Sequence, residues 1–174
     1  LRFNVRFADF LGRRTLNAAA ATPDELSAFL QGSLLFAKPS RGTCGNGIEK
    51  LRTADWPDAE KLLAYLKEKG LDVLEEPLAQ HPDMAKLHPQ SVNTMRIVTD
   101  RVGDTVHIAY IVLKIGRDAF CDNSGQGGGY LPRGREDRQD LLRCNDDYFN
   151  IYETHPDTGI RFEGYQLPMV QEAV

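Results

Sequence analysis

The sequence predicts an α+β protein of two lobes, in which helices pack on antiparallel sheets. Amphipathic stretches with clear caps indicate helices, and β-branched runs joined by tight turns indicate antiparallel strands. A chain of 174 residues can form two small lobes that share a cleft. His81-Pro82 and His88-Pro89 punctuate the middle, so we expect one lobe over residues 1–79 and a second over 80–174.

Two helices are expected in the first half. Thr22 is a helix N-cap, followed by Pro23 at the first position and Glu25 to close a capping box, and this helix ends before Gly32. A second helix opens near residues 55–57. Its apolar residues recur at three- and four-residue spacing, and Gly70 ends it.

Four strands and a loop complete the expected elements. Apolar runs predict short strands over residues 34–37 and 71–74. Longer β-branched runs over 94–99 and 106–115 form a hairpin through the turn at 101–104. Residues 123–147 are polar and glycine-rich and are expected to form a loop.

Composition excludes several classes of function. A net charge of −4 offers no positive field for a nucleic acid. No apolar run approaches the roughly 20 residues that span a bilayer. Three widely spaced cysteines fit neither a disulfide framework nor a zinc site, so we expect a cytoplasmic protein.

The stretch after the first expected strand is the strongest chemical signal. Lys38 precedes a loop with Gly42, Gly45 and Gly47, whose backbone N–H groups could cradle a phosphate. Ile48 follows the last glycine, so this is not a P-loop. A plain hairpin loop with a lysine at the strand end remains the alternative.

Adjacent carboxylates end the strand expected at 71–74. Glu75 or Glu76 could accept hydrogen bonds from an adenine amino group or from ribose hydroxyls, and Pro77 could turn the Leu78 N–H toward a ring nitrogen. Exposed glutamates at a strand end are the alternative.

Two cations follow on the expected hairpin. Arg96 and Lys114 would converge where polyphosphate charge sits if both point into one cleft. Two solvent-facing bases on a one-sided sheet are the commoner case, whereas the strongly apolar neighbours favour a buried sheet.

Asp122 and Asn123 precede three glycines. They could bind a metal or a transferring phosphoryl group, and equally they could form a turn. A proline follows both His81 and His88, so neither is expected on a metal-binding helix face, and residues 155–159 are predicted to form a tight turn between strands. Cys44 is predicted to be a small filler rather than a reactive thiol.

Taken in order, these motifs resemble the ATP-grasp superfamily. They are most similar to the sugar-transfer-associated ATP-grasp branch of bacterial polysaccharide biosynthesis clusters, related to α-L-glutamate ligases. The resemblance rests on Lys38-Pro39 with the glycine loop, residues 75–78 with Gln80-His81, residues 91–96, Gly116-Arg117, Asp122-Asn123 with Gly127-Gly128, and residues 155–159 (His-Pro-Asp-Thr-Gly).

The resemblance implies a two-lobed ATP-grasp fold that binds ATP and Mg²⁺ and joins a small carboxylate to an amine, in a pathway linked to sugar transfer. The residues implied for ATP are Lys38, Gly42, Gly45, Gly47, Glu75, Glu76 and Leu78. The residues implied for catalysis are Arg96, Lys114, Arg117 and Asn123. Asp122 is the candidate for the metal.

One feature departs from the superfamily. Its metal-binding acids commonly form a late Glu-x-Asn motif, which these 174 residues lack. We therefore expect an incomplete ATP-grasp domain, truncated at both ends, with residues 169–174 beginning a helix. The alternative is a non-catalytic nucleotide-binding or scaffolding domain without magnesium ligands.

Overall fold

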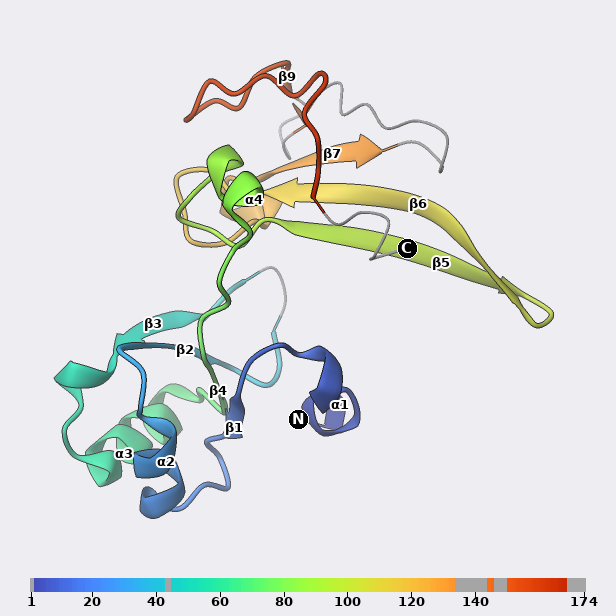
Figure 1. The fold of residues 1–174 in the computed structure, drawn as a ribbon. Coiled ribbons are helices and arrows are strands. Elements are labelled where there is room, and N and C mark those ends of the chain that lie inside the picture. The colour runs from blue at the N-terminus through green and yellow to red at the C-terminus, as the bar shows by residue number, and fades with distance from the viewer. Residues whose placement is uncertain (1, 43–44, 134–143, 146–149, 169–174) are drawn as a thin grey trace. The chain divides into compact units, whose positions relative to one another are not determined.

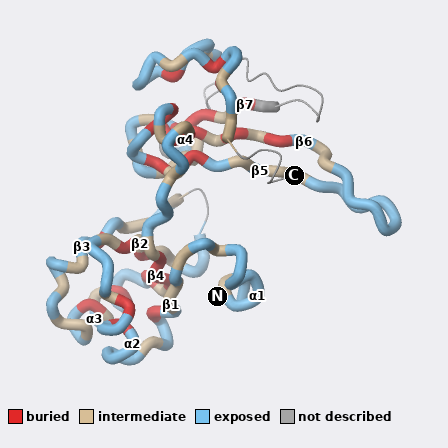
Figure 2. The backbone as a smooth tube through the Cα atoms, viewed as in Figure 1, coloured by how far each residue is buried: buried red, intermediate tan, exposed pale blue. Residues whose placement is uncertain are grey.

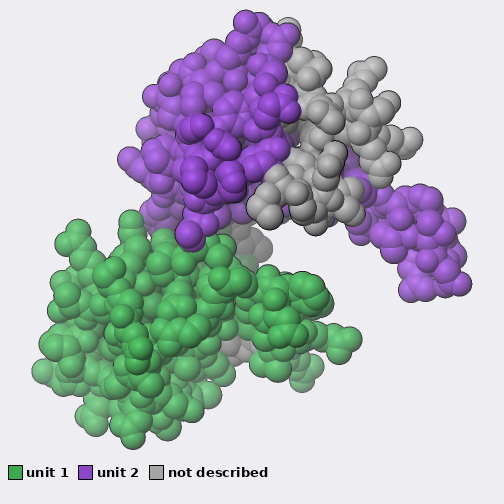
Figure 3. Space-filling model, viewed as in Figure 1, with its two compact units in different colours: residues 1–78 green, residues 79–174 purple. Residues whose placement is uncertain are grey.

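The computed structural model describes residues 2–42, 45–133, 144–145 and 150–168. The chain divides into two compact units, Leu1–Leu78 and Ala79–Val174 (Figure 3). Each unit is a mixture of helices and an antiparallel sheet, which confirms the α+β class and agrees with a partial ATP-grasp fold.

Unit 1 packs helices on one face of a sheet with strand order β1-β4-β2-β3 (Figure 1). Its elements are α1 (Arg2–Arg6), β1 (Thr15–Asn17), α2 (Pro23–Phe29), β2 (Leu34–Lys38), β3 (Glu49–Arg52), α3 (Ala59–Lys69) and β4 (Val73–Glu75), with short 3-10 turns at Ala8–Phe10 and Thr53–Asp55. All neighbouring strands in this sheet are antiparallel.

The caps of α2 and α3 explain where these helices begin and end. The Thr22 side chain accepts from the Glu25 N–H and the Glu25 carboxylate accepts from the Thr22 N–H, so the predicted capping box is present. Asp58 caps α3, and Gly70 ends it in the left-handed conformation. The predicted start of α3 was slightly early, because residues 53–55 form a separate turn.

The core of unit 1 lies between the helices and the sheet. Leu26 of α2, Leu62 and Leu66 of α3, and Leu35 and Leu74 of the sheet are buried in one cluster. Because side chains alternate along a strand, the residues next to Leu35 and Leu74 lie on the opposite face of the sheet. Lys38 and Glu75 are on that opposite face.

The strand expected at residues 71–74 begins later, at Val73. The Leu71 N–H donates to the Leu66 carbonyl at 2.8 Å, so Leu71 still belongs to the end of α3. The first residues of the apolar run therefore belong to the C-terminal end of α3, and the strand runs from Val73 to Glu75.

Unit 2 is built on a sheet with strand order β5-β6-β7-β8-β9. Its elements are α4 (Pro82–Leu87), β5 (Thr94–Val102), β6 (Thr105–Ile115), a 3-10 turn at Ser124–Gln126, β7 (Gly129–Arg133), β8 (Cys144–Asn145) and β9 (Ile151–Tyr152). The predicted hairpin is confirmed, with Gly103 in the left-handed conformation at its turn. The turn end of this hairpin is exposed (Figure 2).

The core of unit 2 covers one face of that sheet. Met84 and Leu87 of α4 pack with Leu113 of β6, Leu131 of β7 and Phe162. The opposite face is open: along β5 the exposed residues alternate with half-buried ones, and Tyr110 of β6 is 49% exposed.

The loop expected over residues 123–147 is only partly correct. Residues 129–133 form β7, which pairs with β6 from Ile115↔Gly129 to Ile111↔Arg133. The glycines in this stretch favour a loop on local grounds. Pairing with the long strand β6 nevertheless gives the backbone groups of residues 129–133 hydrogen-bond partners. Residues 134–143, 146–149 and the helix start expected at 169–174 lie outside the described residues. Within the described part, no helix is long and apolar enough to cross a membrane.

Candidate functional site

The strand ends of unit 1 bring together a cluster that we call the Glu75 cluster: Arg13, Lys38 and Glu75. Glu75 of β4 pairs with Phe36 of the antiparallel strand β2, and Lys38 lies two residues further along β2 on the same face of the sheet. One carboxylate oxygen of Glu75 accepts from Lys38 Nζ at 2.5 Å and from Arg13 Nη2 and Nε at 2.6 and 3.0 Å.

The electrostatics of this cluster favour a bound anion. Glu75 is 8% exposed. Burial opposes its ionisation, but the hydrogen bonds and charges of Lys38 and Arg13 lower the pKa of the Glu75 carboxyl below its ordinary value. Two cations share one carboxylate, which leaves one positive charge. The Lys38 side chain is 30% exposed, so an anion from solvent can reach it.

The glycine loop is the connection of the β2–β3 hairpin, beside Lys38. Gly45 and Gly47 have backbone φ angles of 77° and 73°, which residues with a Cβ rarely adopt. The base of the loop is fixed because Asp72 accepts from the Ser40 N–H at 3.2 Å and from its hydroxyl. Thr43 and Cys44, and with them the predicted role of Cys44, lie outside the described residues.

Glu76 is engaged by a second arginine. Arg14 Nε and Nη2 donate to Glu76 Oε1 at 2.9 and 2.5 Å, and the Arg14 N–H donates to Oε2. The Arg14 guanidinium also lies 5.0 Å from the ring centroid of Phe29. Leu78, which is 38% exposed, lies beyond the end of β4.

The open face of the unit 2 sheet carries a second group, which we call the Lys114 cluster: Thr94, Lys114, Asp122 and Asn123. Thr94 and Lys114 are partners across β5 and β6, so their side chains share a face. Lys114 Nζ lies 3.4 Å from Asp122 Oδ1 and donates to the side-chain oxygen of Asn123. The Thr94 hydroxyl donates to the other oxygen of Asp122.

Arg96 lies on the same face, one alternating position along β5 from Thr94. It is exposed, which corrects the expectation of a buried sheet around this cation. The apolar neighbours that favoured burial belong to the opposite face, where Leu113 joins the core. Among the described residues, no ion pair involves Arg96.

Arg117 belongs to a different set of contacts from those of Lys114. Its Nη1 donates to the Tyr152 hydroxyl at 3.1 Å, and its guanidinium lies 5.4 Å from the ring centroid of Tyr152. Its Nε lies 3.8 Å from an Asp157 oxygen. The hydrogen bond to Tyr152 and the negative charge of Asp157 raise the pKa of Arg117.

Sequence reasoning missed two parts of this arrangement. Arg13 belongs to no recognisable sequence motif. It reaches the Glu75 carboxylate because β1 pairs with β4 and places Thr15 opposite Glu75. A buried polar network that includes His88, Asn93 and His155 was also missed. Its one local signal was the His-Pro-Asp-Thr-Gly motif, whose role as a turn the structure confirms.

A comparison with protein families matches residues 60–174 to the model of sugar-transfer associated ATP-grasp. The match covers more than half of the chain. The chain belongs to the sugar-transfer associated ATP-grasp family. The match begins in α3, so Lys38 and the glycine loop precede it, whereas Glu75 and the Lys114 cluster lie within it. A comparison with curated proteins finds no match.

An ATP-grasp domain binds ATP, and the residues of this family member fit that ligand. The Glu75 cluster has an excess positive charge beside a hairpin with left-handed glycines, which is the chemistry that phosphate groups need. In unit 2, considered by itself, Lys114 and Arg96 place two cations on one face of the sheet.

The described residues offer fewer groups suited to Mg²⁺ than to ATP. In the described stretches of this ATP-grasp chain, no three His, Cys, Asp or Glu side chains gather as a metal site. Asp122 remains the candidate ligand, but one of its oxygens accepts from Thr94 and the other faces Lys114. A metal at Asp122 would therefore share the carboxylate with the Thr94 hydroxyl and lie near the Lys114 ammonium, whose positive charge opposes cation binding.

Proposed function

We propose that this chain is the ATP-binding part of an ATP-dependent ligase that joins a small carboxylate to an amine. The observation that carries the proposal is the Glu75 cluster, in which an accessible lysine is held beside a glycine hairpin in a chain of an ATP-grasp family. ATP supplies the γ-phosphoryl group that activates the carboxylate as an acyl phosphate, which the amine then attacks.

The residues of unit 1 hold the nucleotide in this proposal. Lys38 binds phosphate oxygens, and the N–H groups around Gly42, Gly45 and Gly47 bind the same groups. Glu75 keeps the Lys38 ammonium at the strand end until the nucleotide arrives. The backbone of Glu76 and Leu78 binds the adenine edge, while the Glu76 carboxylate is the acceptor for ribose hydroxyls.

The residues of unit 2 stabilise negative charge. Arg96 and Lys114 bind the phosphoryl group as it transfers, and Asn123 keeps the Lys114 ammonium in place. The contacts of Arg117 with Tyr152 and Asp157 give it a supporting role at the end of β6. Asp122 is the proposed ligand for Mg²⁺.

The family is described as sugar-transfer associated, so we propose a substrate in a sugar-linked pathway. We also propose a place in the cytoplasm, because the three widely spaced cysteines do not suit a disulfide framework. One observation favours a second candidate, a non-catalytic nucleotide-binding domain: Asp122 is engaged by Thr94 and Lys114, and no other metal-binding group of three lies in the described residues.

Calorimetric titration of the chain with ATP separates these candidates. The ligase requires that Mg²⁺ strengthen ATP binding and that ADP release depend on both an acid and an amine. Equal ATP binding with and without Mg²⁺, with no ADP release, would establish the non-catalytic domain. Absence of ATP binding under both conditions would reject the nucleotide function.

A further inference from the structure

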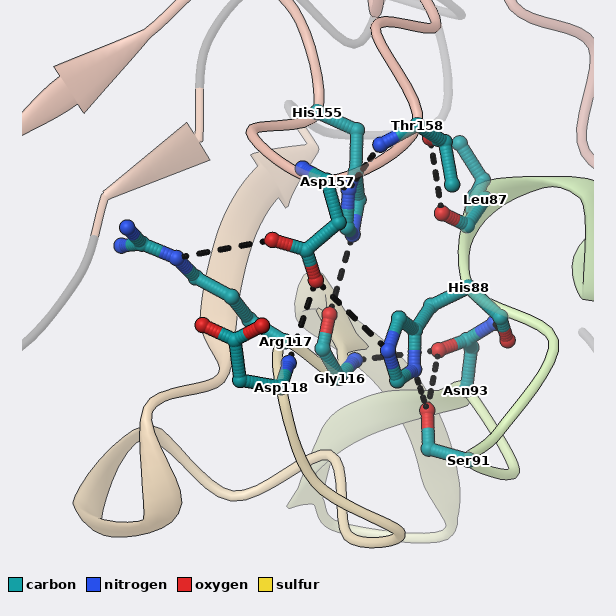
Figure 4. Close-up of polar contacts among 10 residues, drawn as sticks. All are labelled: Leu87, His88, Ser91, Asn93, Gly116, Arg117, Asp118, His155, Asp157 and Thr158. Atoms are coloured by element: carbon teal, nitrogen blue, oxygen red, sulfur yellow. Dashed lines mark hydrogen bonds and ion pairs between the residues drawn. The ribbon is translucent and has the colours of Figure 1, made fainter.

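Gly116, which directly follows β6, is held by groups from two separate segments of unit 2, the connection between α4 and β5 and the turn that begins at His155 (Figure 4). Its N–H donates to Asn93 Oδ1 at 3.1 Å. Its carbonyl lies 2.9 Å from His155 Nε2. A Cβ at this position would lie 2.6 Å from His88 Nδ1 and 2.7 Å from Ser91 Cβ, so only glycine fits. We call these residues and Asp157 the Gly116 network.

The hydrogen bonds of His155 define its tautomer. His155 is fully buried, and its Nδ1 accepts from the N–H groups of Asp157 and Thr158 at 3.2 and 3.4 Å. The proton of the neutral ring is therefore on Nε2, where it is donated to Gly116. Burial lowers the pKa of His155, which keeps the ring neutral.

Asn93 completes the other side of the network. Its Nδ2 donates to the carbonyls of Met84 and His88 at 2.7 and 3.2 Å. Its Oδ1 accepts from Ser91 Oγ as well as from Gly116. Both ends of this buried amide are thus satisfied, which fixes its orientation.

Asp157 holds the next turn of the chain. Its Oδ2 accepts from the Asp118 N–H at 3.1 Å, and its Oδ1 lies 3.8 Å from Arg117 Nε (Figure 4). Asp118 has φ of 53°, a left-handed conformation that is unfavourable for a residue with a Cβ. The hydrogen bond that the Asp118 N–H donates to the Asp157 carboxylate stabilises this strained turn.

The segment that these residues hold leads directly to the Lys114 cluster. Lys114 lies two positions before Gly116 on β6, and the chain after Asp118 returns Asp122 and Asn123 to the Lys114 side chain. The return is close-packed, because a Cβ at Gly128 would lie 2.7 Å from the Ile115 carbonyl. Displacing the start of this segment would therefore separate Lys114 from the groups that orient it.

We propose that His155 and Asp157 are positioning residues that hold the segment from Gly116 to Asp118 and so aim the Lys114 ammonium at the terminal phosphate of ATP. The proposal rests on the proposed function for ATP as the ligand. It goes beyond that function because neither residue touches the open sheet face that carries Lys114. It also assigns a role to the His-Pro-Asp-Thr-Gly turn.

The test compares ATP with ADP, because ADP lacks the terminal phosphate that Lys114 is proposed to bind. His155→Phe keeps the ring but removes both nitrogens, and His155→Gln restores an N–H donor toward Gly116. Asp157→Ala is the second variant, since the Asp157 side chain is 26% exposed and its removal leaves the core packed. Leu131→Ala is the control for a loss of packing alone, as Leu131 is buried in the same core.

We expect His155→Phe and Asp157→Ala to weaken ATP binding about tenfold, by analogy with the loss of residues that support the ligands of a metal, and to leave ADP binding unchanged. His155→Gln should restore most of the ATP affinity. Equal ATP affinity in folded His155→Phe, Asp157→Ala and wild type would overturn the proposal. So would equal losses of ATP and ADP affinity that Leu131→Ala reproduces, because the role would then be purely structural.

The wild-type titration keeps this test separate from that of the proposed function. If the wild-type chain binds neither nucleotide, the proposed function fails and the positioning role fails with it. If the wild-type chain binds ATP and the network variants do so equally well, only the positioning role fails. Nitrogen NMR of the wild-type His155 ring supplies an independent check, since a proton on Nδ1 would contradict the hydrogen bond to Gly116.

Discussion

The Lys38 ammonium and the Glu75 carboxylate form an ion pair at 2.5 Å although the two residues are 37 positions apart in the sequence. They meet because Phe36 pairs with Glu75 and Lys38 with Val73 across β2 and β4, which places the Lys38 and Glu75 side chains in diagonal positions on the sheet face opposite the helices. Arg13 binds the same carboxylate oxygen. Lys38 can therefore move from Glu75 to a ligand while the Glu75 carboxylate keeps a positively charged partner. The pair is thus suited to a lysine that changes partner when an anion binds.

The first prediction concerns Lys38→Met. We expect this variant to bind ATP at least about tenfold more weakly, which corresponds to about 1.4 kcal/mol, because it loses the cation proposed to bind phosphate. Stability should change little, since Arg13 still neutralises Glu75. Calorimetry measures the affinity. Lys61→Met, which removes a 79% exposed lysine from α3, is the control, and an equal loss in both variants would refute the role of Lys38.

The second prediction concerns Glu75→Gln. This change leaves Lys38 and Arg13 without their shared counter-charge, and we expect the free energy of unfolding of unit 1 to fall by about 2 kcal/mol at pH 7. The folded pKa of Glu75 is lowered, so the unfolded chain binds the proton more readily. The stabilisation is complete above the ordinary value of 4.5 and is lost as the pH falls through the lower folded pKa.

Urea denaturation at a series of pH values checks this prediction. The wild type and Glu75→Gln should differ most at neutral pH and converge in acid. A difference that stays constant down to strongly acidic pH would show that the ionised carboxylate is not the source of the stabilisation.

The third prediction concerns Arg96→Ala. Arg96 is exposed on the open sheet face, so we expect the free energy of unfolding to change by no more than about 0.5 kcal/mol. ATP affinity should fall by about tenfold, a loss equivalent to about 1.4 kcal/mol, because a cation proposed to bind the transferring phosphoryl is removed.

Arg101→Ala is the matched control for Arg96. Arg101 lies on the same strand, is 70% exposed and bonds to Asp104 near the hairpin turn. Its removal should leave ATP affinity unchanged. If titrations give Arg96→Ala the affinity of the control, Arg96 has no part in nucleotide binding.

The fourth prediction concerns Gly116→Ala. The added Cβ would lie 2.6 Å from His88 Nδ1, and the surrounding network leaves it no space. We expect a loss of about 2 kcal/mol in the stability of unit 2, as in other overpacked cores. Thermal denaturation measures the loss. Gly32→Ala, where the nearest atom is 3.9 Å from the added Cβ, should unfold like the wild type, and similar stability of both variants would contradict the packing around Gly116.

Local features were predictable where neighbours in the sequence determine them. The capping box of Thr22 and Glu25 and the left-handed cap at Gly70 begin and end helices through contacts within a few residues. The hairpin turn at Gly103 follows the same rule. The β7 strand was missed because Gly129 and the glycines just before it favour a loop locally, while the pairing of β7 with β6 is a long-range contact.

The α+β class, the capped helices, the long hairpin and, through the order of the motifs, the ATP-grasp family follow from the amino-acid sequence alone. The three-dimensional fold was needed to show that Glu75 is the partner of Lys38 and Arg13, that Arg96 lies on an open face, and that His155 holds Gly116. Such contacts depend on which strands pair and in what register. That pairing is set by the burial of whole sheet faces, which no short stretch of the sequence encodes.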